Sequence, residues 1–283
     1  MLQATVNKIL TLLGMALILT GCIEGPEDNS QKITLSFQPI HGSDVKGTIS
    51  IIELENGTTR ITIEADGSFT GNHPVHVHNN TVAEGGSILI TLNDLDQNGR
   101  SITDLIETDA GNPVSFEDFL DLDGHINISE SETNPGDYIA RADIGQNAMT
   151  GRVLIFDLSE LAGSGIKGQV AFQQRLNNTT LITLILENTA SDQQYPALIR
   201  EGSVDNTGDI SITLNPVDGA SGLSYTQVEG IDSPDGDPNQ GEPISYNQLA
   251  NYDGHIVVAS PVTSTLQKNV ATGNIGKNAI STD

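Results

Sequence analysis

The segment SILITLN, residues 87–93, places Ile88, Ile90 and Leu92 on one face of an extended chain. Such spacing is typical of a β-strand with one buried face. A close copy, DISITLN, occupies residues 209–215. Because a repeated strand indicates a repeated fold, the other matches between the two parts of the chain decide its organisation.

Four further pairs of segments recur in the same order along the chain. They are GSDVKG at 42–47 and GSGIKG at 163–168, NGTTRITI at 56–63 and NNTTLITL at 177–184, DGHI at 123–126 and 253–256, and IGQNA at 144–148 and IGKNA at 275–279. Matches that keep their order indicate a tandem duplication. We therefore predict two copies of one domain, residues 32–150 and 151–283.

Each copy has the features of an all-β protein. Short runs of alternating apolar and polar residues are separated by Gly, Asn and Asp, a pattern typical of antiparallel strands in a sandwich or barrel. The exception is a helical spacing after Ser115 and again after Ser245, which predicts one N-capped helical turn in each copy. We predict two tandem antiparallel β-sandwich domains.

The first residues have the features of an export signal. Lys8 is followed by an apolar run over residues 9–19, too short to span a bilayer as a helix. Residues 19–22, LTGC, resemble the bacterial lipobox, so residues 1–21 are predicted to be a lipoprotein signal peptide. Cys22, the single cysteine, is the predicted site of lipidation, where two or three acyl chains would give a stable anchor. Residues 22–31 are acidic and are predicted to form a flexible tether.

Composition narrows the choice of partners. The formal net charge is −25 at pH 7, with 37 acidic and 12 basic residues. A surface of this charge repels nucleic acid and anionic lipid, so neither is an expected partner. The lipid anchor is the predicted route to the membrane. With one cysteine, the chain forms no internal disulfide, and the core must come from packed sheets.

Several of the recurring motifs resemble CHRD domains, a module found in bacterial lipoproteins. The resemblance is carried by HPVHVH at 73–78, AEGG at 83–86, the strand ending at Asn93, DGHINI at 123–128 and ARADIG at 140–145. More remotely, the His-Val-His motif and the closing Ile-Gly resemble the copper/zinc superoxide dismutase sandwich. The resemblance implies an Ig-like or dismutase-like β-sandwich. It implies no particular activity.

The histidines at 73–78 form the one candidate metal site. On a strand, His76 and His78 project from the same face about 7 Å apart, close enough to hold one Cu or Zn ion, and His73 could fold back as a third ligand. The dismutase resemblance places His76 and His78 on paired copper ligands, but the zinc-binding loop and the disulfide of those enzymes have no counterpart here. A polar, hydrogen-bonded surface feature and a proton- or ligand-binding role are the alternatives.

The second copy has Leu198 and Arg200 where the first has His76 and His78. The fold therefore does not require imidazoles at these positions. His125 and His255, by contrast, follow Asp-Gly in both copies. We predict that these two are structural histidines that form hydrogen bonds across a turn.

Two acidic stretches remain. Residues 94–100 begin like a calcium loop, but the twelfth position, where a bidentate Glu is needed, is Leu105, so an ordinary loop is predicted and calcium is not expected. The insertion at 232–239 is rich in Asp, Gly and Pro, and is predicted to be a solvated loop with at most weak cation binding at its surface.

Neither a catalytic triad nor a phosphate-binding or metalloprotease motif occurs in the sequence. We therefore predict a non-enzymatic binding or structural protein, held by lipid in the bacterial cell envelope, on the periplasmic or outer face of the outer membrane. Its expected partner is an extracellular or envelope protein or glycan. The alternative is an envelope protein that binds copper or zinc through His76 and His78. A degenerate superoxide dismutase-like enzyme is the weakest of the three.

Overall fold

The computed structural model describes residues 31–37, 40, 42–161, 163–261 and 268–279. The predicted signal peptide and Cys22 lie outside these residues, as does the predicted tether up to residue 30. The chain divides into two compact units that meet in the sequence between Gly151 and Arg152. We call the described residues before this point the N-terminal unit and those after it the C-terminal unit.

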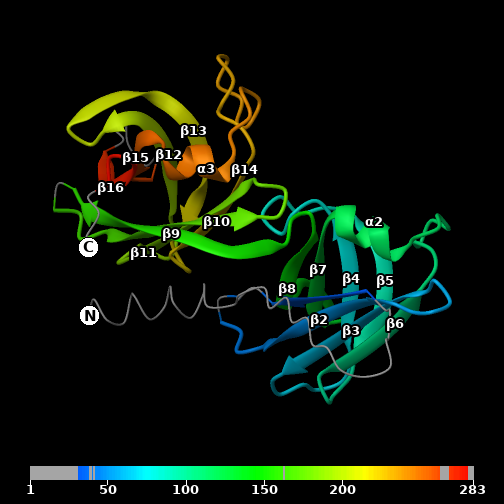
Figure 1. The fold of residues 1–283 in the computed structure, drawn as a ribbon. Coiled ribbons are helices and arrows are strands. Elements are labelled where there is room, and N and C mark those ends of the chain that lie inside the picture. Colours follow the sequence, from blue (N-terminus) through cyan, green and yellow to red (C-terminus); the bar gives the residue numbers. More distant parts are fainter. Residues whose placement is uncertain (1–30, 38–39, 41, 162, 262–267, 280–283) are drawn as a thin grey trace, which may run out of the picture. The chain divides into compact units, whose positions relative to one another are not determined.

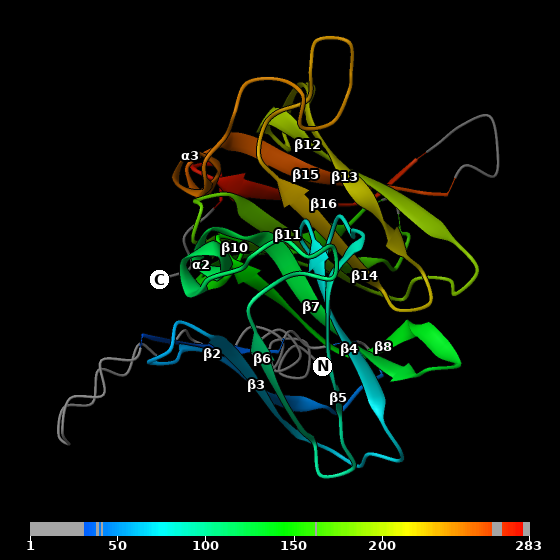
Figure 2. The same cartoon turned by 90° about the vertical axis from the view of Figure 1, so that its right-hand side faces the viewer.

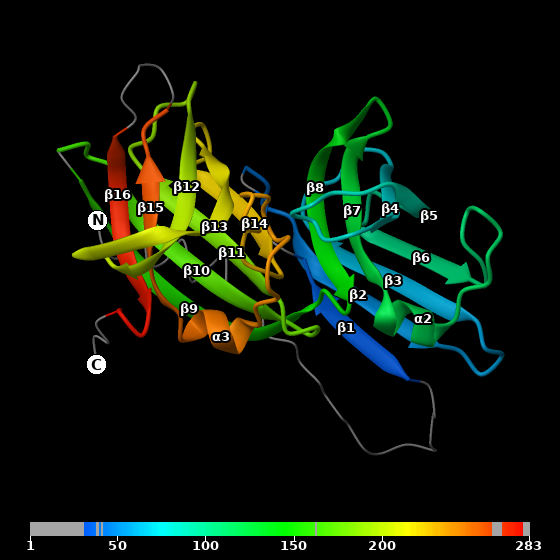
Figure 3. The same cartoon turned by 90° about the horizontal axis from the view of Figure 1, so that it is seen from above.

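The N-terminal unit consists of two four-stranded antiparallel sheets around one apolar core (Figures 1 and 3). One sheet has the order β1-β2-β3-β6, from β1 (Lys32–Ser36), β2 (Lys46–Glu53), β3 (Thr59–Asp66) and β6 (Arg100–Leu105). The other has the order β5-β4-β7-β8, from β5 (Ile88–Leu95), β4 (His73–Asn79), β7 (Asp123–Ser131) and β8 (Asn134–Gly145). Side chains that alternate along both sheets fill the core, among them Ile49, Ile63, Val75, Val77 and Ile126.

The C-terminal unit is a closed eight-stranded barrel (Figure 1). Its order is β10-β11-β14-β13-β12-β15-β16-β9. The strands are β9 (Met149–Glu160), β10 (Lys167–Arg175), β11 (Thr180–Glu187), β12 (Gln194–Ser203), β13 (Asn206–Asp218), β14 (Leu223–Val228), β15 (Asp253–Ala259) and β16 (Asn269–Gly276). The barrel encloses its own core, which includes Phe172, Ile199, Tyr246 and Ile256.

The two units have the same strand order, and the barrel differs from the paired sheets at two seams. The order β10-β11-β14 followed by β13-β12-β15-β16 repeats β2-β3-β6 and β5-β4-β7-β8. The barrel closes through Asp218 paired with Leu223 and through two residue pairs between β16 and β9. The all-β prediction is confirmed. For the second copy we predicted a β-sandwich, and the structure has a closed barrel, because short backbone pairings at the sheet edges join the two sheets.

Each unit contains the predicted helical turn. Helix α2 (Phe116–Asp121) begins at the N-cap Ser115, and α3 (Tyr246–Ala250) begins at Ser245. Both have a capping box in which the serine side chain accepts from the third helical N–H and the third side chain, Asp118 or Gln248, accepts from the N-cap backbone. Helix α3 lies beside β10 and β16 (Figure 2). No helix among the described residues has the length and apolar character needed to cross a bilayer.

The recurring sequence motifs form the hydrogen-bonded joints of the fold. The Asn93 side chain donates to Ile102 O on β6, while its backbone N–H and C=O bond the Thr103 and Ser101 hydroxyls. Asn215 makes the same three bonds in the C-terminal unit, with Tyr225, Thr226 and Ser224.

Two other recurring residues, an asparagine and a serine, make equivalent hydrogen bonds in the two units. The Asn147 amide donates to Asp123 at 2.7 Å, and the Asn278 amide donates to Asp253 at 2.7 Å. The hydroxyls of Ser43 and Ser164 donate to backbone carbonyls at 2.6 and 2.7 Å. The residues that recur in both units therefore make hydrogen bonds that hold loops and strands together within each unit.

Candidate functional site

The candidate site lies on the face of the β5-β4-β7-β8 sheet that points away from the core. Val75 and Val77 of β4 are fully buried in the core, so the alternating residues His76 and His78 project to the opposite face. Strand β7 pairs with β4 so that His78 lies opposite His125 and His76 lies opposite Asn127. This pairing brings three histidines from two strands together.

The three imidazole rings are in contact. The His78 and His125 rings stack with their centroids 4.9 Å apart and their planes 13° apart. The His76 ring meets His78 edge to face, with centroids 6.0 Å apart and an angle of 84° between the planes. His125 is 2% exposed and His78 is 8% exposed, whereas His76 is only partly buried. His76 is therefore the member of the cluster that solvent reaches best.

Backbone hydrogen bonds set the tautomers of the two stacked histidines. Nδ1 of His78 lies 3.0 Å from Gly86 O, and Nδ1 of His125 lies 2.8 Å from Asn80 O. Because a carbonyl oxygen only accepts, the N–H of each neutral ring is at Nδ1 and the lone pair is at Nε2. Nε2 of His125 accepts from the Asn127 amide at 3.1 Å.

The same bonds hold the loop between β4 and β5 to the sheet. His125 and His78 donate to its two ends, at Asn80 and Gly86. Asp143, which lies opposite His125 on β8, accepts from the Val82 N–H at 2.7 Å. The histidine cluster is thus the support of a surface loop as well as a group of titratable side chains.

Burial lowers the pKa of two of these histidines. For His76, desolvation is the largest cause and the neighbouring His78 adds to it, while Asp109 and Asp94 act in the opposite direction. For His125, desolvation outweighs the bond to Asn80, which raises the pKa. Burial therefore favours the neutral forms of His76 and His125.

His73 does not join the cluster. It is buried on the core side of β4, where it lies opposite Leu95 and its ring contacts Phe69 with centroids 5.5 Å apart. Its Nδ1 lies 3.2 Å from Ser129 O. The alternation of side chains along a strand places His73 with Val75, away from His76, so the third ligand suggested by the sequence is not available to the pair in this structure.

The arrangement does not form a complete metal centre. Protein sites for zinc and copper use three or four side-chain ligands, and the described residues contain no group of three His, Cys, Asp or Glu side chains placed to hold a metal ion. His76 and His78 alone, with their rings edge to face, are an incomplete ligand set. At 94–100, Asp96 accepts from the N–H groups of Asn98 and Arg100, as in an ordinary strand-end turn.

The C-terminal unit keeps one part of this site and replaces the rest. His255 is 1% exposed and its Nδ1 donates to Gly202 O at 2.9 Å, as His125 does to Asn80. Opposite His255 lies Arg200, and Leu198 lies opposite Val257. The pairing with β15 therefore places Arg200 at the position of His78 and Leu198 at the position of His76.

A second feature recurs beside the outer face. In the N-terminal unit, Asp109 accepts from the N–H and hydroxyl of Thr91, at 2.9 and 2.8 Å. In the C-terminal unit, Asp232 accepts from the hydroxyl of Thr213 at 2.7 Å. The backbone N–H groups of both aspartates donate to the strand beside them, to Leu89 O and Ser211 O. We call each of these an Asp–Thr latch.

The sequence did not reveal that His125 belongs with the pair. The contact arises because β7 pairs with β4, which lies about fifty residues earlier, and nothing in the local pattern of either segment specifies that pairing. The recurring latch was also missed, because Asp109 and Asp232 stand in segments of different length. The repeated Thr91 and Thr213 were the available signal.

Comparison with models of known protein families and with curated proteins finds no match for this chain.

Proposed function

We propose that this chain is a lipid-anchored protein of the bacterial cell envelope that acts as a non-enzymatic binding module through two CHRD-like domains. Lipid on Cys22 would hold it at the outer membrane, and an envelope protein or glycan would bind its exposed sheet faces. The motif resemblance and the lipobox pattern support this proposal, and the matching strand order within the two units adds to it.

One observation carries the binding role. The residues that recur in both units, such as Asn93 and Asn215, form the joints of the fold, while the outer sheet face differs between the units. The same face presents His76 and His78 in one unit and Leu198 and Arg200 in the other. A common framework with a varied surface is typical of binding domains, whose specificity lies in the side chains placed on the framework.

Site-specific photo-crosslinking in intact cells tests the binding role. A benzophenone side chain is placed at Thr91 or at Ile210, which are exposed at the outer faces, and at Glu55 in the exposed β2–β3 turn as the matched control. We expect a discrete adduct from at least one outer-face position and none from Glu55. Equal labelling from all three positions, or no adduct from either face, would contradict the proposal.

The anchor has a separate test. Cells grown with radiolabelled palmitate should label the protein, and Cys22→Ser should abolish the label and release the protein from the membrane fraction. Label that survives the Cys22→Ser substitution would remove the anchor from the proposal.

The second candidate function is copper or zinc binding at His76 and His78. The observation in its favour is that His78 donates its Nδ1–H to Gly86 O, which leaves Nε2 as a lone-pair donor with a fixed ring orientation. Metal-ligating histidines commonly have their other nitrogen bonded in this way. Because His73 lies on the core side, we propose a two-histidine site that an exogenous ligand would complete.

Metal analysis separates this candidate from the first. It requires one Cu²⁺ or Zn²⁺ per chain that is released on acidification and lost in the His76→Ala/His78→Ala variant. Arg200→Ala, at the equivalent position in the other unit, is the matched control and should leave the stoichiometry unchanged. Protein that binds neither ion would eliminate this candidate.

A further inference from the structure

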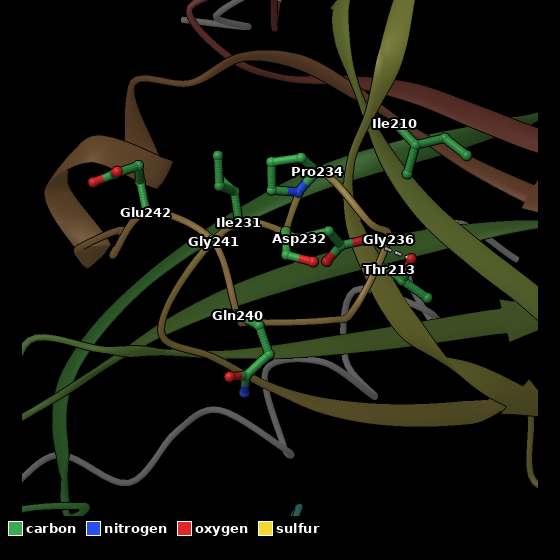
Figure 4. Close-up of a pocket in the computed structure, with 10 residues that line it drawn as sticks. Ile210, Thr213, Ile231, Asp232, Pro234, Gly236, Gln240, Gly241 and Glu242 are labelled. Carbon is green, nitrogen blue, oxygen red and sulfur yellow. Dashed lines mark hydrogen bonds between the residues drawn. The ribbon is translucent and has the colours of Figure 1, made fainter.

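The C-terminal unit contains a cavity of about 670 Å³ beside its Asp–Thr latch (Figure 4). One wall is strand β13, which contributes Ile210 and Thr213, and the other is the segment between Ile231 and Glu242. This segment includes the insertion predicted from the sequence to be a solvated loop. Residues 234–238 are exposed, as that prediction expects, and the loop also makes its own hydrogen bonds, including Ser233 N–H to Asp237 O at 2.9 Å and Gly236 N–H to Ser233 O at 2.8 Å.

The latch aspartate of this unit has one oxygen unused. In the N-terminal unit, both carboxylate oxygens of Asp109 accept from Thr91. In the C-terminal unit, Oδ2 of Asp232 accepts from Thr213, while Oδ1 is buried and has no hydrogen-bond partner among the described residues. Figure 4 shows the Asp232 side chain at the centre of the cavity wall, with Pro234 and Ile231 beside it.

A buried carboxylate oxygen without a partner is unfavourable, since it has lost water and gained no donor. No Lys or Arg among the described residues forms an ion pair with Asp232. The insertion therefore leaves a carboxylate oxygen without a donor in the wall of the cavity, at a position where both carboxylate oxygens of the other unit are hydrogen-bonded.

The other residues that line the cavity favour a hydrogen-bond donor on an apolar stem. Ile210 is 50% exposed beside the cavity, and Ile231 and Pro234 add apolar surface. Gln240 and Glu242 contribute polar groups at the rim. An apolar wall leading to a buried carboxylate suits a cation carried on an aliphatic stem, because the stem covers the apolar side chains while the charged end reaches the oxygen.

We propose that this cavity binds a primary ammonium or guanidinium group on an aliphatic stem, with Asp232 Oδ1 as its acceptor. The group can come from a free aliphatic amine or from a Lys or Arg side chain of a partner. This assignment rests on the proposed binding role and gives it a ligand class. It does not depend on the lipid anchor.

Calorimetric titration of the full chain, purified in detergent micelles, tests the assignment. The probes are Nα-acetyl-lysine methylamide and Nα-acetyl-arginine methylamide for the side-chain source, and 1,4-diaminobutane for the free amine. The neutral isostere Nα-acetyl-norleucine methylamide is the control. We expect binding by at least one cationic probe and none by the neutral one, and the probe that binds more tightly identifies the source.

Matched variants locate the site. Asp232→Asn keeps an oxygen for Thr213 and removes the charge, so it should weaken binding of the cationic probe at least about tenfold. Asp109→Asn makes the same change in the N-terminal latch, where Thr91 already bonds both carboxylate oxygens, and should have no effect. Ile210→Ser, at an exposed position, should weaken binding a few-fold without affecting folding.

Three results would overturn the assignment. They are equal binding of the neutral and cationic probes, unchanged affinity in a folded Asp232→Asn variant, and binding of Ca²⁺ but of no amine. Because the titration needs neither the membrane nor the natural partner, a negative result removes this ligand class and leaves the crosslinking test of the binding role intact.

Discussion

The rings of His78 and His125 stack 4.9 Å apart, and each donates its Nδ1–H to one end of the loop between β4 and β5. Protonation of His125 would place a positive charge against the face of the His78 ring inside a poorly solvated site. The protonation of His125 is therefore coupled to the stability of the N-terminal unit.

The first prediction follows from the lowered pKa of His125. In the unfolded chain this imidazole titrates near pH 6.5, and burial lowers its pKa in the folded unit. The unfolded state therefore takes up the proton first as the pH falls. Stability should be unaffected well above pH 6.5 and should decrease below it, by at most about 1.4 kcal/mol per pH unit for this group, until the folded-state pKa is passed.

Scanning calorimetry at pH 8.0, 6.5 and 5.5 measures this dependence. His125→Gln should lower the stability at pH 8.0 by about 1–2 kcal/mol, because Asn80 O loses the Nδ1–H donor, and should flatten the dependence below pH 6.5. His255→Gln, which alters the C-terminal unit, should leave the acid dependence of the N-terminal unit in place. An undiminished slope in His125→Gln would show that other groups cause it.

Gly145 provides the second prediction. Its φ is +59°, and an added Cβ would lie 2.2 Å from Leu122 O, at the end of helix α2. Gly145→Ala should therefore destabilise the N-terminal unit by more than about 3 kcal/mol. The control is Gly111→Ala, since Gly111 has a φ of +78° but nothing within 4 Å of its Cβ position. It should cost about 1 kcal/mol. Similar melting temperatures for the two variants would contradict the role of the close approach.

The sequence was sufficient for the strands and for the two helix starts, because both leave local signals. Alternating residues such as Ile49 and Ile51 identify a buried face, and Ser115 and Ser245 mark the helix starts. Closure of the barrel left no such signal, since it depends on a few backbone pairs, including Asp218 with Leu223. Sheet edges expose the same N–H and C=O groups whether or not they pair, so side-chain patterns do not distinguish the two arrangements.

The candidate site was predictable to a smaller extent. The common face of His76 and His78 follows from their spacing, but the stacking of His125 requires the pairing of distant strands. Similarly, the composition of residues 232–239 indicated a turn-rich loop. The cavity depends on where that loop folds back against Ile210, which is a tertiary contact and leaves no trace in composition.

The third prediction concerns the joint between β5 and β6. The Thr103 hydroxyl accepts from the Asn93 N–H at 2.9 Å. Thr103→Val keeps the shape of the side chain and removes this acceptor, so it should cost about 1–2 kcal/mol in a urea unfolding experiment. Thr62→Val, on β3, is the control, because the Thr62 hydroxyl makes no hydrogen bond within the described part of the chain. Equal effects of the two substitutions would mean that the joint contributes little.

The fourth prediction concerns a buried charge in the C-terminal unit. Arg175 is fully buried, and its Nε donates to Gln227 Oε1 at 2.7 Å. Gln227→Leu removes this acceptor from a guanidinium that cannot reach water, and we expect a loss of about 3 kcal/mol in the unfolding of this unit. Leu54 is the residue of the N-terminal unit that is equivalent to Arg175. The Leu54 N–H donates to Thr58 O, as the Arg175 N–H donates to Thr179 O.

Because Leu54 is equivalent to Arg175, leucine is the residue to place at position 175 in the control variant. In the double variant Arg175→Leu/Gln227→Leu, the guanidinium is absent and no charge is left without its acceptor. Most of the loss in Gln227→Leu should therefore be recovered, giving a coupling of about 2 kcal/mol in a double-mutant cycle by urea unfolding. If the two substitutions prove additive, the Arg175–Gln227 contact does not stabilise the barrel, and the cost of each arises from packing alone.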